Sequence, residues 1–212
     1  MRNLFVLKRF ADYSLHYKLF AIATPIIVQN LVIYLQLQVD MAMLGHANTL
    51  YLSAVGNVMF PYNIVIAFMT ALSTGVTVLS SYSVGGRAIK SAQRYAEVSF
   101  FFNFLVAIPL FLTLYFSADG LMTWMGTTAQ INEYGTVFMR SVSFSVLFLG
   151  VSLSITSILM GSGKTSYLMV AAIIGTVTNI GLDWVLIYGH LGFPELGIQG
   201  AGLATSLANF LA

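Results

Sequence analysis

The sequence lacks cysteine altogether, has few charged residues and contains only three histidines, and each shortage excludes a class of chemistry. Without cysteine, disulfides, thiolate catalysis and thiolate metal sites are excluded. His16, His46 and His190 are far apart in the sequence and near predicted water interfaces, so we expect no metal cluster. The basic residues form no clustered face of the kind that nucleic-acid binding requires, so we expect no nucleic-acid partner.

Apolar residues dominate what remains. Of the 212 residues, 58% are hydrophobic and 8% are charged, and the mean hydropathy is +0.86. A soluble domain normally carries about 25% charged residues. The composition therefore predicts an integral membrane protein that contacts the lipid bilayer.

Long apolar runs predict the individual helices. A transmembrane helix needs about 20 mostly apolar residues, and five runs meet that length. A sixth run begins near Ile198 and is still apolar at Ala212, but it would span only about 22 Å of a roughly 30 Å hydrocarbon core. We therefore predict an all-α membrane domain over residues 17–212, truncated inside its sixth helix. The predicted helices cover residues 19–44, 53–82, 98–117, 136–160, 166–189 and 198–212.

The first 16 residues have a different character. Arg2, Lys8 and Arg9 are interspersed with apolar side chains, and no small-residue cleavage site follows them. This pattern predicts an amphipathic helix on the membrane surface and not a signal peptide. If the N-terminus is cytoplasmic, every basic residue except Arg140 faces the cytoplasm. The positive-inside rule therefore predicts a multi-pass plasma-membrane protein with a cytoplasmic N-terminus.

Two carboxylates stand alone inside the apolar runs. Asp40 lies five residues before Gly45, and Asp183 lies six before Gly189, so both should lie about 7–9 Å below the outer helix ends. A charge at mid-membrane costs roughly 2.5–3.5 kcal/mol on insertion scales and usually marks an ion or proton pathway. Each carboxylate has an amide four residues earlier, on its own helix face. Those amides are Gln36 and Asn179, and Thr205 and Asn57 fall at a similar depth.

Other roles are open to these carboxylates. Asp40 could pair with a cation elsewhere in the protein, and Asp183 could merely solvate a helix end. Arg140 is the one basic residue near that depth. Carboxylates without a fixed counter-charge in a low-dielectric cavity bind protons or coordinate Na⁺ through oxygen ligands. The pattern favours an ion-coupled membrane protein.

Pro25 marks a second feature. Like Pro61 and Pro109, it lies inside an apolar run, where proline removes a backbone hydrogen bond and can kink the helix. A kink can act as a hinge or can be static packing, and for Pro109 we favour static packing.

Enzymatic activity has no support in the residues. The stretch Gly161-Ser-Gly-Lys164-Thr165-Ser166 imitates a nucleotide-binding loop, but Ile158 stands where that pattern needs glycine. No histidine lies in a predicted membrane segment to activate a serine, so we expect no enzyme. Serines such as Ser145 and Ser154 could hydrogen-bond between helices or line a cavity.

Several spaced motifs resemble one known family. Pro25 followed by Gln29, then Asp40-Met-Ala-Met-Leu-Gly45 and Leu52-Ser-Ala-Val-Gly56, resemble the first two helices of the multidrug and toxic compound extrusion (MATE) family. Asn179-Ile-Gly-Leu-Asp183 and Gly197-Ile-Gln-Gly-Ala-Gly-Leu-Ala-Thr205 are similar to its fifth helix and the start of its sixth. The resemblance implies the N-terminal six-helix lobe of a two-lobe antiporter in a bacterial inner membrane, with the C-terminal lobe missing.

The resemblance also implies a site. Asp40, Asn179, Asp183 and Thr205 match the cation site of the prokaryotic branch often called DinF-like, where proton or Na⁺ binding is linked to bending of the first helix at the proline matched by Pro25. In this branch a coupling ion, H⁺ or Na⁺, takes the place of a cofactor. One departure is Leu153, flanked by Ser152 and Ser154, where family members often carry asparagine.

The expected cargo is a small cationic amphipathic drug. Aromatic and methionine side chains adapt to varied substrates, so we predict a cavity wall that includes Tyr34, Phe60, Tyr62, Phe68 and Met69, with Gln36 and Asn57 as polar contacts. The alternative is a lipid-linked oligosaccharide flippase of the same superfamily, whose anionic pyrophosphate would call for intramembrane basic residues. Only Arg140 is available here.

Overall fold

The computed structural model describes residues 13–211, and within that range it is built from helices and short turns. Most of the surface helix predicted for residues 1–16 lies outside this range. Five of the helices, α2, α3, α4, α6 and α7, are long and apolar enough to cross a membrane, which confirms the predicted fold class. The elements are α2 (Tyr13–Ala47), α3 (Thr49–Gly85), α4 (Ile89–Phe116), α5 (Ala118–Trp124), α6 (Ala129–Gly161), α7 (Thr165–Tyr188), the 3-10 turn η1 (His190–Gly192) and α8 (Ile198–Leu211).

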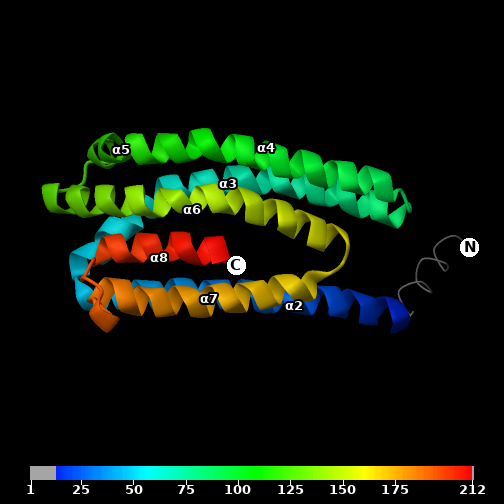
Figure 1. Cartoon of the computed structure of the whole chain (residues 1–212), viewed down its shortest axis with the longest axis horizontal. Coiled ribbons are helices and arrows are strands. Elements are labelled where there is room, and N and C mark those ends of the chain that lie inside the picture. The colour runs from blue at the N-terminus through cyan, green and yellow to red at the C-terminus, as the bar shows by residue number, and fades with distance from the viewer. Residues whose placement is uncertain (1–12, 212) are drawn as a thin grey trace, which may run out of the picture.

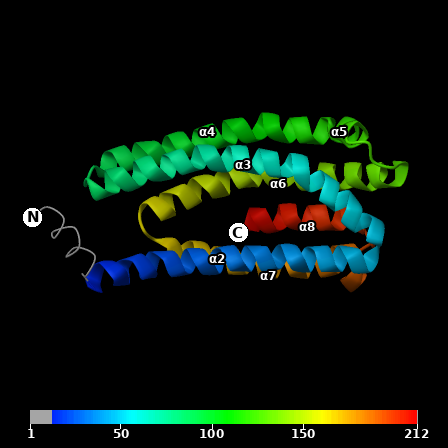
Figure 2. The same ribbon diagram turned by 180° about the vertical axis from the view of Figure 1, so that it is seen from behind.

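The long helices form two groups that lie side by side. In one group α2 packs against α7, and in the other α3 and α4 pack against α6 (Figures 1 and 2). Helix α8 lies between the groups and contacts both α6 and α7. The last described residue of α8 lies partway along the bundle (Figure 1).

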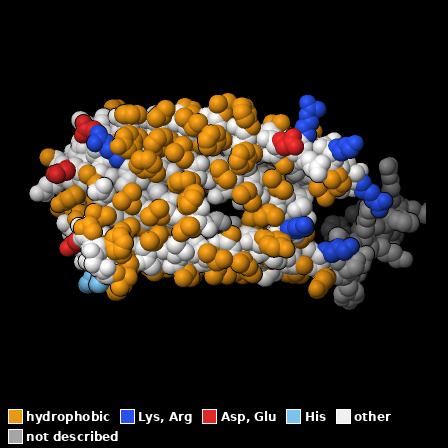
Figure 3. Space-filling view, viewed as in Figure 1, with side chains coloured by type: hydrophobic (Ala, Val, Ile, Leu, Met, Phe, Trp, Pro, Cys, Tyr) orange, Lys and Arg blue, Asp and Glu red, His pale blue; other side chains and the backbone are white. Residues whose placement is uncertain are grey.

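The core between the helices is made of small and flexible apolar side chains. Ala54, Val58, Met69, Met139 and Val146 are completely buried. Many large apolar side chains are instead exposed on the outside of the bundle. On the face shown in Figure 3 they cover most of its length, and most of the visible Lys and Arg side chains lie at one end. An apolar outer belt with a charged end is the surface that a bilayer requires.

A buried polar network ties α3, α4 and α6 together. The amide nitrogen of Asn103 lies 3.0 Å from the hydroxyl of Ser154 and 3.2 Å from those of Ser73 and Ser99, so its two N–H groups are shared among three acceptors. The hydroxyl of Ser157 donates to the backbone carbonyl of Ser73 at 3.0 Å. Interhelical hydrogen bonds of this kind stabilise membrane bundles by roughly 0.6 kcal/mol each on average. Ser154 thus bonds between helices, one of the two roles considered for the serines.

Glycines let α8 approach its neighbours closely. A Cβ atom at Gly200 would lie 2.6 Å from the backbone oxygen of Leu186 on α7. A backbone atom cannot rotate away as a flexible side chain can, so a helix must shift to make room. By contrast, a Cβ atom at Gly181 on α7 would meet nothing within 4 Å.

We therefore expect Gly200→Ala to destabilise the full-length protein by roughly 1–3 kcal/mol, the usual cost of overpacking. Thermal unfolding of the detergent-purified protein, followed by tryptophan fluorescence, measures the change. Gly181→Ala is the matched control: it adds no clash and replaces a glycine inside a helix, so it should unfold at or above the wild-type temperature. Equal unfolding temperatures for the two variants would show that α8 does not depend on this close contact.

Candidate functional site

The two intramembrane carboxylates face each other from adjacent helices. Asp40 lies on α2 and Asp183 on α7, and each is close enough to act on the charge of the other. Asp183 is 1% exposed and Asn179, one turn earlier on α7, is completely buried. Helix α7 packs along α2 and so brings together two residues 143 positions apart (183 − 40).

The polar atoms of this cluster lack partners among the described residues. Asp40 Oδ1, both carboxylate oxygens of Asp183 and both side-chain amide atoms of Asn179 are buried and receive no hydrogen bond from another described group, although the two carboxyl groups are close enough to share a proton. Buried polar groups in folded proteins are nearly always hydrogen-bonded, and an uncompensated buried charge is costly. A cluster that concentrates five such atoms is suited to receive a proton, a cation or water. We call Asp40, Asn179 and Asp183 the carboxylate cluster.

Gln36 connects the carboxylate cluster to the rest of the bundle. Its side chain contacts Asp40, four residues later on α2. Its amide oxygen accepts a hydrogen bond of 2.9 Å from the Thr176 hydroxyl on α7. Since the oxygen is engaged by Thr176, the amide N–H groups are available on the side of Asp40. Thr176 was not among the predicted site residues, although Thr176, Asn179 and Asp183 follow the three- and four-residue spacing of one helix face.

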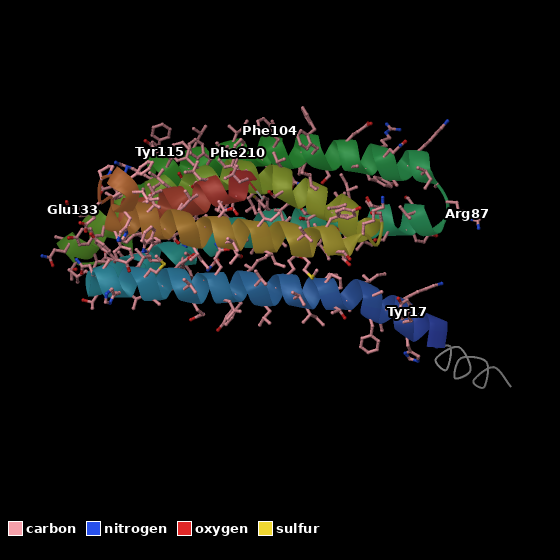
Figure 4. All side chains as sticks on the ribbon, turned by 60° about the horizontal axis from the view of Figure 1, so that its bottom comes forward. Tyr17, Arg87, Phe104, Tyr115, Glu133 and Phe210 are labelled. Carbon is pink, nitrogen blue, oxygen red and sulfur yellow. The ribbon has the colours of Figure 1, made fainter. Side chains whose placement is uncertain are left out.

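A cavity of about 610 Å³ adjoins this polar contact. Gln36 and Thr176 line it together with Gln29 and Ser152, and most of the remaining wall is apolar. Phe104 on α4 and Phe210 on α8 contribute aromatic rings to the wall (Figure 4). The cavity wall also includes Ala208 and Asn209, which together with Phe210 lie in the last turn of α8 that the structure describes.

The remaining predicted site residues make contacts within their own helices or lie away from the wall of the cavity. The Thr205 hydroxyl is directed to the carbonyl of Ala201 on its own helix, at 3.0 Å. The Asn57 amide likewise donates to the Ser53 carbonyl at 2.8 Å. Tyr34 is 60% exposed on α2, whereas Met69 is fully buried in the core. Among the predicted cavity residues, Gln36 lines the 610 Å³ cavity, while Asn57, Tyr34 and Met69 are absent from its wall.

The predicted aromatic wall is also distributed differently. Phe60 and Phe68 are more than half exposed on α3. Tyr62 is buried, and its hydroxyl lies 2.6 Å from that of Ser145 on α6. Leu153, at the position noted for its departure from the family, packs against the core. Its neighbour Ser154 belongs to the Asn103 network, so of this trio Ser152 is the residue that lines the cavity.

A metal centre built on several ionisable ligands has no counterpart in the described part of the chain. Within residues 13–211, no three His, Asp or Glu side chains gather at one point. A cation at the carboxylate cluster would therefore be held by two carboxylates and neutral oxygens. Oxygen ligands of this kind suit hard cations such as Na⁺.

Comparison with known proteins identifies the family. The family model MatE matches residues 25–185, which include Pro25, Asp40, Asn179 and Asp183. The chain belongs to the MatE family. Its relatives include the "Uncharacterized transporter YisQ" of Bacillus subtilis, 28% identical over 205 residues, which cover 97% of this chain and 45% of YisQ. The "Probable multidrug resistance protein NorM" of Streptococcus pneumoniae (strain R6) is 28% identical over 185 residues, or 87% of this chain and 41% of NorM.

Solved structures agree with this assignment at the level of the fold. A structure described as the outward-facing conformation of a multidrug resistance MATE family transporter superposes with a TM-score of 0.83. It is 24% identical, and the match covers 91% of this chain and 42% of that one. The chain thus has the fold of the N-terminal lobe of a MATE transporter and spans less than half the length of the relatives that it matches.

Proposed function

We propose that this MatE lobe belongs to a secondary active exporter of small cationic amphipathic compounds, driven by H⁺ or Na⁺. The carboxylate cluster carries the proposal, because it gathers five buried polar atoms from two helices. It lies one helical turn from Gln36 and Thr176, which line a cavity of about 610 Å³. Relatives named as probable multidrug resistance proteins support the export of drugs. Cation binding at the cluster drives export if it stabilises inward- and outward-facing states by different amounts.

The proposed transporter needs a second lobe and has a defined orientation. Because the chain spans 41–45% of the relatives above, we propose that a C-terminal lobe completes the transport path. Tyr17 and Arg87 lie at the same end of the bundle, opposite Glu133 (Figure 4). We assign the end with Arg87 to the cytoplasm, because Lys and Arg side chains gather there (Figure 3).

The cavity wall favours a drug over an anionic lipid carrier. A flippase for pyrophosphate-linked lipids would require positive groups at the phosphates, and none of the residues that line the cavity is Lys or Arg. Besides the exported compound, the proposal needs a coupling ion, H⁺ or Na⁺.

Gradient-driven dye export tests the function. The full-length protein, reconstituted in liposomes that contain a cationic fluorescent dye, should move the dye across the membrane when an inward H⁺ or Na⁺ gradient is imposed. Export should stop when an ionophore collapses the gradient. Dye movement that is independent of both gradients would contradict a secondary antiporter.

A further inference from the structure

Helix α2 carries Pro25 but runs as one uninterrupted helix from Tyr13 to Ala47. Proline has no N–H group, so the carbonyl of Ala21, four residues earlier, loses its intrahelical partner and the turn is weakened. A helix with such a defect bends readily unless a neighbour supports it. The support has to come from the element that packs along α2, which is α7.

Three side chains of α7 donate hydrogen bonds to α2. The Thr165 hydroxyl donates to the carbonyl of Ile22 at 3.0 Å, in the turn that Pro25 weakens. The Thr176 hydroxyl donates to Gln36 at 2.9 Å, and the Tyr188 hydroxyl donates to the carbonyl of Met43 at 2.8 Å. One acceptor therefore precedes Pro25 and two follow it.

Thr165, whose hydroxyl donates to a carbonyl that precedes Pro25, is itself held in place by its surroundings. Thr165 is 1% exposed and is the first residue of α7. The end of α6, four residues before Thr165, packs closely on α3, because a Cβ atom at Gly161 would lie 2.9 Å from Ser80 Cβ. The stretch from Gly161 to Ser166, which resembles a nucleotide-binding loop in sequence, thus places the Thr165 hydroxyl against α2.

We propose that α7 stabilises the straight form of α2 through the hydrogen bonds donated by Thr165, Thr176 and Tyr188, and we call these three bonds the splint. The three hydroxyls thereby set the ratio of straight to bent α2. Bending at Pro25 moves the two parts of α2 relative to each other, so α7 cannot keep its bonds to both. Thr176 lies on the same face of α7 as Asn179 and Asp183, so the splint and the carboxylate cluster share one helix face. The inference rests on the proposed transport function and on the hinge role that the family resemblance implies for Pro25.

Spin-label distances in the full-length protein measure the balance directly. The chain has no cysteine, so within it introduced cysteines are the only labelling sites. One label pair replaces Tyr17 and Lys90 at the inner end, and a second replaces His46 and Trp124 at the outer end, all exposed positions. Any cysteine elsewhere in the full-length protein is replaced by serine first. Each of Thr165→Val, Thr176→Val and Tyr188→Phe removes one hydroxyl with little change of shape.

Each substitution should change the ratio of straight to bent α2 in favour of the bent form by roughly threefold, the factor for one interhelical hydrogen bond in a membrane. Thr74→Val is the matched control, because the Thr74 hydroxyl bonds only the Thr70 carbonyl on its own helix at 2.8 Å. Thr165→Ser keeps the hydroxyl and should retain the wild-type distances.

Pro25→Ala separates failure of the splint from failure of the hinge. In that background helical bonding is complete, so the hydroxyl substitutions should no longer change the distances. If Pro25→Ala alters the distances but the three hydroxyl variants do not, the splint is wrong and the hinge stands. If Pro25→Ala itself leaves both distances and export unchanged, the hinge fails. Equal effects of Thr165→Val and Thr74→Val would also overturn the splint.

Discussion

Asp183→Asn in the full-length protein is expected to abolish cation-driven dye export, and Asp40→Asn to have a similar or slightly milder effect. Asparagine keeps the size and hydrogen-bonding groups of aspartate but cannot alternate between charged and neutral forms. The substitution therefore separates ion coupling from packing. Asp183 should be the more sensitive position, because it is 1% exposed and both its carboxylate oxygens lack a partner among the described residues.

The same assay includes graded controls. Asn179→Ala should weaken coupling without abolishing it, because it removes two polar atoms and not the charge. Asp119→Asn changes an exposed carboxylate on α5 and should export dye at the wild-type rate. Protein levels in the vesicles are matched by immunoblot. If both intramembrane variants still move dye against a gradient at normal rates, the carboxylates are structural and coupling resides elsewhere.

Pro25→Ala is expected to slow export strongly while the protein stays folded and inserted. Proline disfavours the helical state by about 3 kcal/mol relative to alanine, so the substitution stabilises straight α2. Because bending then costs more, the export rate should fall by roughly tenfold or more, the factor that 1.4 kcal/mol produces. The unfolding temperature should be unchanged or higher, which distinguishes slow transport from misfolding.

Pro109→Ala is the matched control for the hinge. Pro109 lies inside α4, away from the carboxylate cluster, and its side chain is exposed. We expect its replacement to leave the export rate within twofold of wild type, on the order of the change that a surface substitution produces. Wild-type export by the Pro25→Ala protein would remove Pro25 from the mechanism.

The sequence predicted the membrane-spanning parts of the helices better than their ends. Helix α4 was expected to begin at residue 98, yet it begins at Ile89, because the polar stretch before the membrane is helical too. Likewise α3 was expected to begin at residue 53 but begins at Thr49. The side chain of Asn48 caps this start by accepting a hydrogen bond from the backbone N–H of Leu50 at 2.9 Å. Hydropathy detects contact with lipid, so it is insensitive to helix that extends into water.

Helix α5 was missed for a related reason. It has seven residues, Ala118–Trp124, too few to produce a membrane signal. Its position depends on tertiary packing, because Ala118 and Met122 are completely buried. A short helix that is stabilised mainly by such contacts leaves no clear local pattern in the sequence.

For the candidate site, the depth of each side chain in the membrane could be derived from the sequence, but the rotation of each helix about its own axis could not. Counting residues from the helix ends placed Asp40 and Asp183 at one level, and the structure places them beside each other. The same counting cannot say which way a helix face turns toward its neighbours. Tyr34, for example, is 60% exposed, which counting along the helix did not indicate. That these residues bind a cation stays a prediction.

Infrared difference spectroscopy on the purified full-length protein tests the central claim, that the carboxylate cluster binds the coupling cation. Adding H⁺ or Na⁺ to the wild type should change a carboxyl stretching band, toward the protonated acid for H⁺ or within the carboxylate region for Na⁺. The Asp40→Asn, Asp183→Asn double variant should lose that change while Asp119→Asn keeps it. An identical band in the wild type and the double variant, in a preparation that transports dye, would contradict the assignment of Asp40 and Asp183 as the cation site.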